Sequence, residues 1–230
     1  DQNYGGTQSH SWMWKAAEGF FNEISWTGSG AVRTLKHHLN KTPEMIWVRG
    51  RSLTEDWTCY FAALGNTKYL QINGTGAAGN SGTGGGQANL WNNTTPTDTV
   101  FTVGTHGRVN TSGEKYVAYA FTSLDGVAKC GSYTGTGSTI NVDCGFSNGA
   151  KYVFIRNAYH GGAWLQWDST RGISTANNDP YLTLNTTSAQ STDAGARDIG
   201  PYSSGFSVTG TDSDINTNGN TYVFYAIAEP

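Results

Sequence analysis

The sequence predicts an all-β protein made of two tandem antiparallel β-sandwich repeats packed side by side. Two observations lead to this prediction: an internal repeat, and a composition rich in strand and turn formers. A chain of 230 residues suffices for two small β domains that each bury a core without a metal or a disulfide. We expect an N-terminal extension over residues 1–11, a first repeat over 12–125 and a second over 126–230.

The repeat appears without a gap when residues 25–65 are laid over residues 132–172. Trp57 and Trp164 are 107 residues apart, as are Arg49 and Arg156. After short insertions the match resumes and continues to the end of each repeat. The chain therefore uses one plan twice.

The composition favours strands joined by tight turns. The chain holds 31 Gly, 8 Trp, 12 Tyr and 9 Phe beside abundant Thr, Asn and Ser. Aromatic and β-branched residues favour strands, whereas Asn-Gly and Gly-Gly pairs tolerate the positive φ of hairpin turns. Each repeat supplies about seven strands, as in a β-sandwich. The clearest strand-like runs are 45–49, 151–156, 163–167, 181–184 and 222–228.

Charge and hydropathy exclude two classes of partner. Charged residues make up 13% of the chain, the net charge is −3 and the pI is about 5.9, so there is no basic stripe for a nucleic acid. No apolar run approaches the roughly 20 residues of a membrane-spanning helix. We expect neither nucleic-acid binding nor membrane insertion, and we expect the chain to be part of a longer protein.

Two segments depart from the repeat. Residues 74–99 contain three consecutive glycines and Trp91, and residues 186–200 form a more polar insert at the corresponding place. Long loops in compact domains usually have a function. These inserts are therefore the expected location of properties particular to this chain.

Several motifs resemble a repeat family of structural proteins from marine bacteriophages and prophages. They are Trp-x-Trp-Lys-x-Ala-x-Gly-Phe-Phe at 12–21, Pro-Glu-Met-Ile-Trp-Val at 43–48, the segments 99–104 and 131–137, Trp-Asp-Ser-x-Arg at 167–171, and Ser-Gly-Phe at 204–206. The resemblance covers nearly the whole chain. It implies a virion protein, extracellular in the particle, with lectin-like or jelly-roll-like sandwich domains in a tail fibre, another appendage or the capsid.

No pattern indicates an enzyme. Glycoside hydrolysis needs two carboxylic acids, and the second repeat offers Asp143, Asp168, Asp179 and Asp198. In the first repeat, Lys36 and Phe61 stand at the positions of Asp143 and Asp168. Asp168 beside Arg171 is more simply an edge-strand carboxylate with a nearby partner. We therefore expect a non-enzymatic protein without a cofactor.

The histidines and the acidic turn do not predict a metal site. His37 and His38 are adjacent, so on a strand they face opposite sides. The other three histidines, His10, His106 and His160, lack Cys or carboxylate neighbours at ligand spacing. The segment 212–219 alternates oxygen donors in a manner similar to a calcium loop, but its counterpart 106–113 has no aspartate. We interpret it as a structural turn, with calcium as the alternative.

Cys130 and Cys144 lie symmetrically about residue 137. If residues 127–146 form a hairpin that turns at Gly135-Thr-Gly137, the two thiols face each other across the ladder. A cross-strand disulfide and a pair of reduced buried thiols are both compatible with this pattern. Cys59 is expected to be a small buried residue.

Aromatic residues carry the predicted binding chemistry, because sugar rings stack their apolar faces on Trp and Tyr. Trp57 and Trp164 recur at one register and are expected to be packing residues. The predicted ligand-binding residues are instead aromatic and polar side chains of loops, namely Trp91, Tyr159, His160, Asp198 and Tyr202.

These observations favour a virion module, most simply a distal tail-fibre or appendage part, that adheres to host-surface glycans. Other virion proteins are expected partners, and a homotrimer would add avidity. Two alternatives remain open: a purely structural capsid decoration or fibre protein, and a carbohydrate-active enzyme or secreted lectin.

Overall fold

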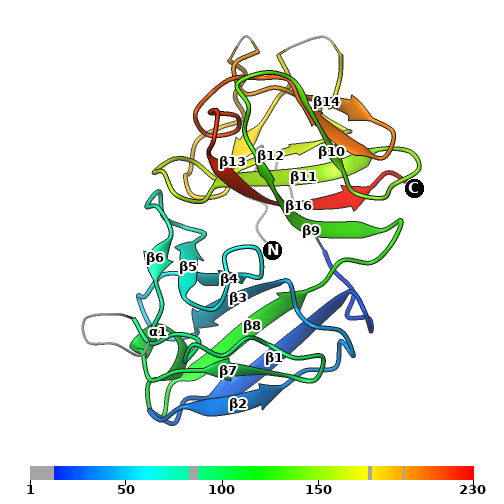
Figure 1. Ribbon diagram of the computed structural model, residues 1–230. Helices are drawn as coiled ribbons and strands as arrows, with labels where there is room; N and C mark the ends of the chain where they lie inside the picture. Colours follow the sequence, from blue (N-terminus) through cyan, green and yellow to red (C-terminus); the bar gives the residue numbers. More distant parts are fainter. Residues whose placement is uncertain (1–12, 83–87, 176–177, 194) are drawn as a thin grey trace, which may run out of the picture.

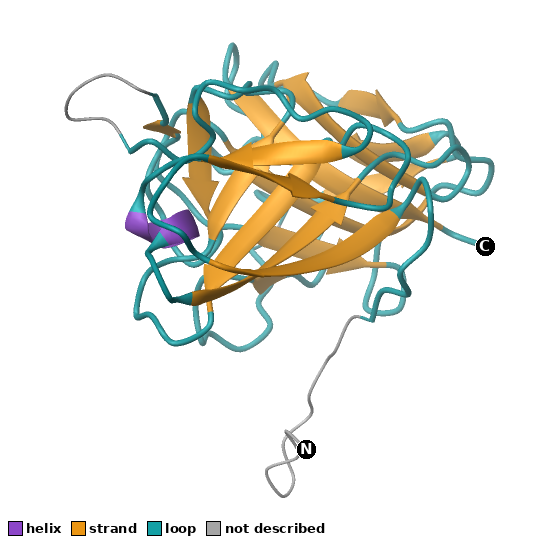
Figure 2. Ribbon diagram, turned by 90° about the horizontal axis from the view of Figure 1, so that it is seen from below, coloured by secondary structure: helices purple, strands orange, loops and turns teal. Residues whose placement is uncertain are grey.

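The protein is all-β, as predicted. The computed structural model describes residues 13–82, 88–175, 178–193 and 195–230 (Figure 1). Strands and loops make up almost everything in this part of the chain, where the only helix is the single turn α1 (Gly107–Asn110) (Figure 2). No helix in these ranges has the length and apolar character needed to cross a bilayer.

The first half of the chain forms a six-stranded and a two-stranded antiparallel sheet, which we call unit 1. The large sheet has the order β1-β8-β3-β4-β5-β6, and the small sheet pairs β2 with β7. The strands are β1 (Phe21–Thr27), β2 (Arg33–Lys36), β3 (Met45–Gly50), β4 (Thr58–Phe61), β5 (Lys68–Gln71), β6 (Gly79–Asn80), β7 (Val100–Val103) and β8 (Lys115–Phe121).

The second half forms a five-stranded and a three-stranded antiparallel sheet, which we call unit 2. The large sheet has the order β13-β12-β11-β16-β9, and the small sheet has the order β10-β15-β14. The strands are β9 (Ala128–Thr134), β10 (Ile140–Asp143), β11 (Ala150–Asn157), β12 (Leu165–Asp168), β13 (Leu182–Thr183), β14 (Ile199–Tyr202), β15 (Gly205–Val208) and β16 (Thr221–Ala228).

The two units share detailed hydrogen bonding as well as sheet order. Asn110 Oδ1 accepts a hydrogen bond from Ser29 N at 2.9 Å, and Asn216 Oδ1 accepts one from Thr136 N at the same distance. Both asparagines are fully buried. Each therefore ties the start of its unit to the turn before the last strand, which explains why asparagine occurs at both positions.

The sheets stack in four layers, small, large, large, small (Figure 1). One apolar core lies between the small and large sheets of each unit, centred on Phe101 and Tyr116 in unit 1 and on Trp167 and Phe206 in unit 2. Side chains alternate between the two faces of a strand. The opposite face of each large sheet points away from the core of its own unit, and we call it the outer face. It is therefore free to form a third core.

This third core lies between the units, which pack face to face. Phe61 of β4 lies 6.0 Å from Trp164 between ring centres, and Trp47 of β3 lies 6.0 Å from Phe154 of β11. The expected side-by-side packing of the repeats is a face-to-face contact, because the outer faces of both large sheets are apolar.

The first part of the 74–99 insert crosses from unit 1 to unit 2. The Ala78 backbone N–H donates to Ala158 O at 2.7 Å, and Gly162 N–H donates to Thr75 O at 2.9 Å. We call residues 71–78 the strap. Part of this insert therefore joins the units.

Unit 2 provides two side chains that bind carbonyls of the strap. Arg156 Nη2 donates to Thr75 O at 2.8 Å and to Gly76 O at 2.6 Å, and Trp164 Nε1 donates to Gln71 O at 2.9 Å. The guanidinium carbon of Arg156 lies 5.8 Å from the centre of the Trp164 ring. Both donor side chains are completely buried, whereas Thr75 and Gly76 of the strap are exposed.

Candidate functional site

The outer faces of the two large sheets are equivalent but are not equally covered. Cross-strand pairs occur at matching positions, since Trp47 pairs with Tyr119 in unit 1 and Phe154 pairs with Tyr225 in unit 2. Four residues of unit 2 are buried: Phe154, Arg156, Trp164 and Tyr225. Their counterparts in unit 1 are half-buried: Trp47, Arg49, Trp57 and Tyr119.

The partly uncovered face of unit 1 contains a cleft of about 370 Å³, which we call the aromatic cleft. Its walls are mainly aromatic, with one carboxylate. The lining residues are Trp14, Phe21, Glu23, Trp47, Trp57, Ile72 and Tyr119.

The rings in the aromatic cleft form a fixed arrangement. Trp57 stacks on Tyr119 with ring centres 5.9 Å apart and planes at 22°, while Trp14 meets Trp47 edge to face at 6.4 Å. Glu23 pairs with Tyr119 in the β1–β8 ladder and is exposed. Its carboxylate forms no hydrogen bond or ion pair within the described ranges. The cleft thus offers flat apolar surfaces beside an available hydrogen-bond acceptor.

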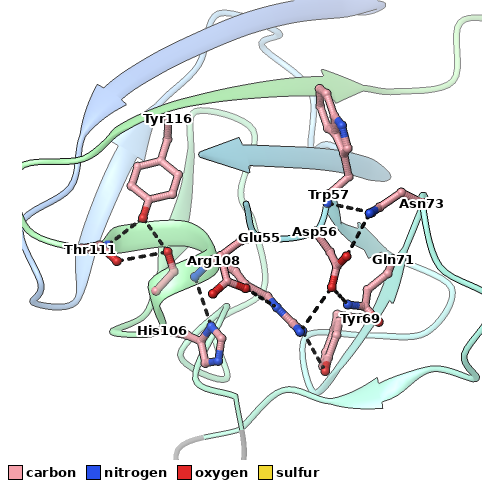
Figure 3. Close-up of polar contacts among 11 residues, drawn as sticks. Glu55, Asp56, Trp57, Tyr69, Gln71, Asn73, His106, Arg108, Thr111 and Tyr116 are labelled. Carbon is pink, nitrogen blue, oxygen red and sulfur yellow. Dashed lines mark hydrogen bonds and ion pairs between the residues drawn. The ribbon is translucent and has the colours of Figure 1, made fainter. Parts of the chain in front are cut away.

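A polar network fixes the backbone of Trp57 (Figure 3). Trp57 N–H donates to Asn73 Oδ1 at 2.9 Å, and Asn73 Nδ2 donates to Asp56 Oδ1 at 2.8 Å. Gln71 donates to the other oxygen of Asp56, which also forms an ion pair with Arg108 at 3.4 Å. The strands β4 and β5 and the helix α1 thereby fix the backbone from which the indole ring projects.

Arg108 is held at the centre of this network (Figure 3). It pairs with Glu55 at 3.3 Å and donates to Tyr69 OH at 3.2 Å, with its guanidinium carbon 5.7 Å from the tyrosine ring centre. His106 caps α1, because its Nδ1 accepts from Arg108 N–H at 3.1 Å. Burial, followed by the charge of Arg108, lowers the pKa of His106. The imidazole is therefore neutral near pH 7.

Unit 2 builds the same tyrosine–arginine contact from other residues. Arg197 donates to Tyr181 OH at 3.0 Å and lies 5.6 Å from the ring centre. It forms ion pairs with Asp212 at 3.2 Å and with Asp214 at 3.1 Å. Asp214 stands at the position of Arg108, so unit 2 has an acidic residue where unit 1 has the base.

These ion pairs explain the acidic turn at 212–219. Asp212 and Asp214 are engaged with Arg197 and the turn is closed by Asn216, as in a structural turn. The described ranges contain no group of three or more His, Cys, Asp or Glu side chains placed to hold a metal ion. In this structure the two aspartates of the turn therefore serve the ion pairs with Arg197.

Two of the predicted ligand residues are buried. Trp91 is 2% exposed, packs on Tyr60 and donates its indole N–H to Lys68 O at 3.0 Å. Asp198 is 1% exposed and accepts hydrogen bonds from the backbone N–H groups of Asn178 and Asp179. Neither can contact a ligand in this structure, because Trp91 completes the core of unit 1 and Asp198 closes a loop of unit 2.

The other three predicted residues lie at the surface of unit 2. Tyr159 is 47% exposed and His160 is exposed, and their backbone N–H groups both bind Asn157 Oδ1. Tyr202 is half-buried and lines a hollow of about 330 Å³ together with Glu229. The five predicted residues are thus divided between two units and do not form one site.

The carboxylates considered for hydrolysis have structural partners. Asp168 accepts from Arg171 Nε at 2.6 Å and pairs with its Nη2 at 2.5 Å, as expected for an edge-strand carboxylate with a nearby partner. Asp179 accepts from the Ser174 hydroxyl at 2.9 Å. Burial raises the pKa of Asp179 despite these hydrogen bonds.

Of the two alternatives for Cys130 and Cys144, the structure has the reduced buried thiols, and all three cysteines are free and buried. The predicted hairpin is wrong, because β9 pairs with β16 whereas β10 pairs with β15 in the other sheet. Cys130 therefore lies in the core between the units, and Cys144 lies within unit 2. Burial raises the pKa of the Cys144 thiol to about 12 and that of Cys130 well above its usual range.

The chain belongs to a domain family of unknown function, DUF7483, whose family model matches residues 1–230. Comparisons with curated proteins and with solved structures gave no match. The geometry of the aromatic cleft is therefore the main guide to function.

Proposed function

We propose that this member of the DUF7483 family is a non-enzymatic glycan-binding module of a virion appendage such as a tail fibre. The observation that carries the proposal is the aromatic cleft, where Trp57, Trp47 and Tyr119 are half-buried on an otherwise well-packed β face. Large aromatic side chains left partly uncovered in a cleft are typical of ligand sites.

The chemistry of the cleft suits a sugar ring. Pyranose rings present apolar C–H faces that pack on the rings of Trp57 and Tyr119, and Glu23 can accept hydrogen bonds from hydroxyls. The cleft volume of about 370 Å³ is within the range of roughly 300–1,000 Å³ typical of small-molecule sites. One or two sugar rings would fill it.

The cleft is prepared for binding in advance. The backbone of Trp57 is held through Asn73 and Asp56 and its ring is stacked on Tyr119, so the ring is already packed before a ligand arrives. Immobilising a flexible side chain would otherwise cost about 0.5–1.5 kcal/mol. The proposed binding surface is the face of the large sheet, where rigid strands support it, and not the loops that the sequence favoured.

Binding without hydrolysis is the simpler chemistry for this cleft. Glu23 is the one acidic residue among the side chains that line it, within the described part of the chain. Glycosidases generally use two carboxyl groups, about 5–10 Å apart across the scissile bond. The cleft thus supports recognition of a glycan and offers no acid–base pair for cleaving it.

The assignment to a virion rests on the resemblance to phage structural repeats. An adhesive module at the end of a fibre would contact other virion proteins, and a trimer would multiply weak contacts with a host-surface glycan. Antibodies against this chain are expected to label appendages of intact particles. Recovery of the chain only from the soluble fraction of lysed hosts would contradict a virion location.

A panel of immobilised glycans tests the binding proposal. The wild-type protein is expected to retain a defined subset of glycans, and Trp57→Ala is expected to lose them. Tyr159→Ala is the matched control, because it removes an exposed loop aromatic and should leave binding unchanged. The proposal fails if the wild type binds no glycan, or if Tyr159→Ala abolishes binding while Trp57→Ala does not.

A second candidate function is a purely structural role in a capsid or fibre. It is favoured by one observation, namely that the equivalent face of unit 2 is buried against unit 1. If another protein covers the aromatic cleft in the same way, Trp57 is an interface residue. Concentration-dependent self-association that Trp57→Ala abolishes, together with no glycan binding, would favour this role.

A further inference from the structure

Arg49 lies on the outer face of unit 1, beside the aromatic cleft. It belongs to β3, two residues after Trp47, and therefore projects from the same face. The last β3–β4 pair joins Val48 to Thr58, so the register places Arg49 opposite Trp57. Arg49 and Trp57 thus lie directly beyond the last paired residues of two adjacent strands.

The Arg49–Trp57 pair is equivalent to the Arg156–Trp164 pair of unit 2. Arg49 pairs with Val117 of β8, as Arg156 pairs with Val223 of β16. The backbone after each tryptophan also matches, because Ile72 N–H donates to Trp57 O at 3.3 Å, and Leu184 N–H donates to Trp164 O at 2.9 Å. What unit 2 binds with this pair therefore indicates what the same pair in unit 1 is able to bind.

In unit 2 the pair binds three amide carbonyls. Arg156 Nη2 donates to the carbonyl oxygens of Thr75 and Gly76, and Trp164 Nε1 donates to the carbonyl oxygen of Gln71. All three groups belong to secondary amides of the strap. The donor arrangement of an arginine beside an indole N–H thus selects amide oxygens in this fold.

In unit 1 the same donors are available. Arg49 and Trp57 are both half-buried. Over the described ranges, the Arg49 guanidinium and the Trp57 indole N–H form no hydrogen bond, and Arg49 forms no ion pair. A half-buried cation and a ring N–H are left beside a cleft that already suits a sugar ring.

We propose that Arg49 and Trp57 recognise the acetamido group of an N-acetylated amino sugar in the aromatic cleft. This inference rests on the proposed glycan binding and names the sugar class. The acetamido group is a secondary amide, the same chemical group that the strap presents to Arg156 and Trp164. The sugar ring would stack on Trp57 and Tyr119, with the amide oxygen directed at Arg49 and ring hydroxyls at Glu23.

The open aromatic walls favour an amino sugar over a peptide as the source of the amide. In unit 2 the amides of the strap come together with apolar side chains of unit 1 such as Phe61, which packs on Trp164. In unit 1 the exposed Glu23 borders the cleft where unit 2 has the buried Cys130. A carboxylate that accepts hydroxyl groups fits a sugar better than an apolar chain.

Two disaccharides that differ only in the acetamido groups provide the test. Chitobiose and cellobiose are titrated into the full chain by calorimetry. The wild type is expected to bind chitobiose at least about tenfold more tightly, the effect of one hydrogen bond to a charged group. Arg49→Gln should reduce chitobiose binding to the level of cellobiose and leave cellobiose binding unchanged. Arg49→Lys should give an intermediate loss, because the planar fork is removed but the charge stays.

Arg51→Gln is the matched control, because it removes the same charge from an exposed residue two positions away. It should alter neither affinity. Equal binding of the two disaccharides, or wild-type behaviour of Arg49→Gln, would overturn the acetamido assignment and leave glycan binding intact. If neither disaccharide binds but a peptide of residues 71–78 does, the cleft is a protein-docking surface and both proposals fail.

Discussion

Trp57 and Trp164 occupy the same position in their sheets, yet Trp164 is completely buried while Trp57 is half-buried at the edge of a cleft. Both backbone N–H groups donate to an asparagine Oδ1 at 2.9 Å, from Asn73 and Asn185 respectively. This backbone hydrogen bond is thus the same in both units, whereas the covering layer differs. One repeated residue therefore has a packing role in one unit and is available for binding in the other.

The two tryptophans should differ sharply in their contribution to stability. Trp164→Ala is expected to lower the free energy of unfolding by about 3–5 kcal/mol, because it leaves a large cavity between the units. Trp57→Ala should cost only about 1 kcal/mol, since its ring is already partly hydrated. Urea unfolding of both variants checks this. Similar losses would show that the two rings are equally packed in solution.

The tyrosine hydroxyls of β8 and β16 should stabilise both units equally. Tyr222 OH donates to Ser213 O at 2.9 Å and accepts from Thr217 N–H at 2.8 Å, and Tyr116 forms the equivalent bonds. Tyr116→Phe and Tyr222→Phe are each expected to cost about 1–3 kcal/mol, because a buried backbone group loses its partner. Thermal unfolding of the single variants measures this. A negligible loss in either unit would contradict an equivalent role.

His37 should make stability depend on pH. Its Nδ1 accepts from Leu39 N–H at 3.3 Å and its Nε2 lies 3.2 Å from Thr97 O, so the ring is neutral. Burial lowers the pKa of His37 in the folded state. The stabilisation is therefore complete above the unfolded pKa of about 6.5 and is lost as the pH falls through the lower, folded value.

Unfolding free energies measured between pH 7.5 and pH 5 should fall with a slope that approaches about 1.4 kcal/mol per pH unit for this one proton. His37→Gln should flatten the profile, whereas His38→Gln, at an exposed neighbour, should follow the wild type. A profile that His37→Gln leaves unchanged would show that this histidine is not buried in its neutral form.

The three cysteines should be unreactive in the folded protein. Cys59, Cys130 and Cys144 are buried, and burial raises the pKa of each thiol, so the thiolate population near neutral pH is very small. A chromogenic disulfide reagent is expected to release no signal before denaturant is added and three equivalents afterwards. Release of one equivalent after unfolding would instead indicate a disulfide.

The repeat and the strand pattern were sufficient to predict the all-β fold, because alternation and turn chemistry are local properties. Asn110 and Asn216 stand at matching positions of the repeats, but their hydrogen bonds to Ser29 and Thr136 join residues far apart in the sequence. The Cys130–Cys144 hairpin was wrong, since a strand can continue into the second sheet of a sandwich as readily as return beside itself. Only the long-range pairing of β10 with β15 and of β9 with β16 distinguishes these two arrangements.

The candidate site was harder to predict because exposure depends on how the units pack. Trp57 and Trp164 recur at the same position of the repeat, so the sequence alone predicts the same role for both. Their exposure differs only because the strap and unit 1 cover the face of unit 2 that carries Trp164. Trp91 was predicted to be a loop aromatic, but its insert folds back into the core. A usable signal was present in the register: Glu23 lies where unit 2 has Cys130, which marks the face that is not buried.

The indole N–H signals of a ¹⁵N-labelled sample test the central claim most directly, because each of the eight tryptophans gives its own resonance. On titration with chitobiose, the signals of Trp57 and Trp47 are expected to shift, while those of the buried Trp26, Trp91 and Trp164 stay in place. Shifts confined to backbone signals around Tyr159 and Tyr202, or no shift at all, would contradict glycan binding in the aromatic cleft.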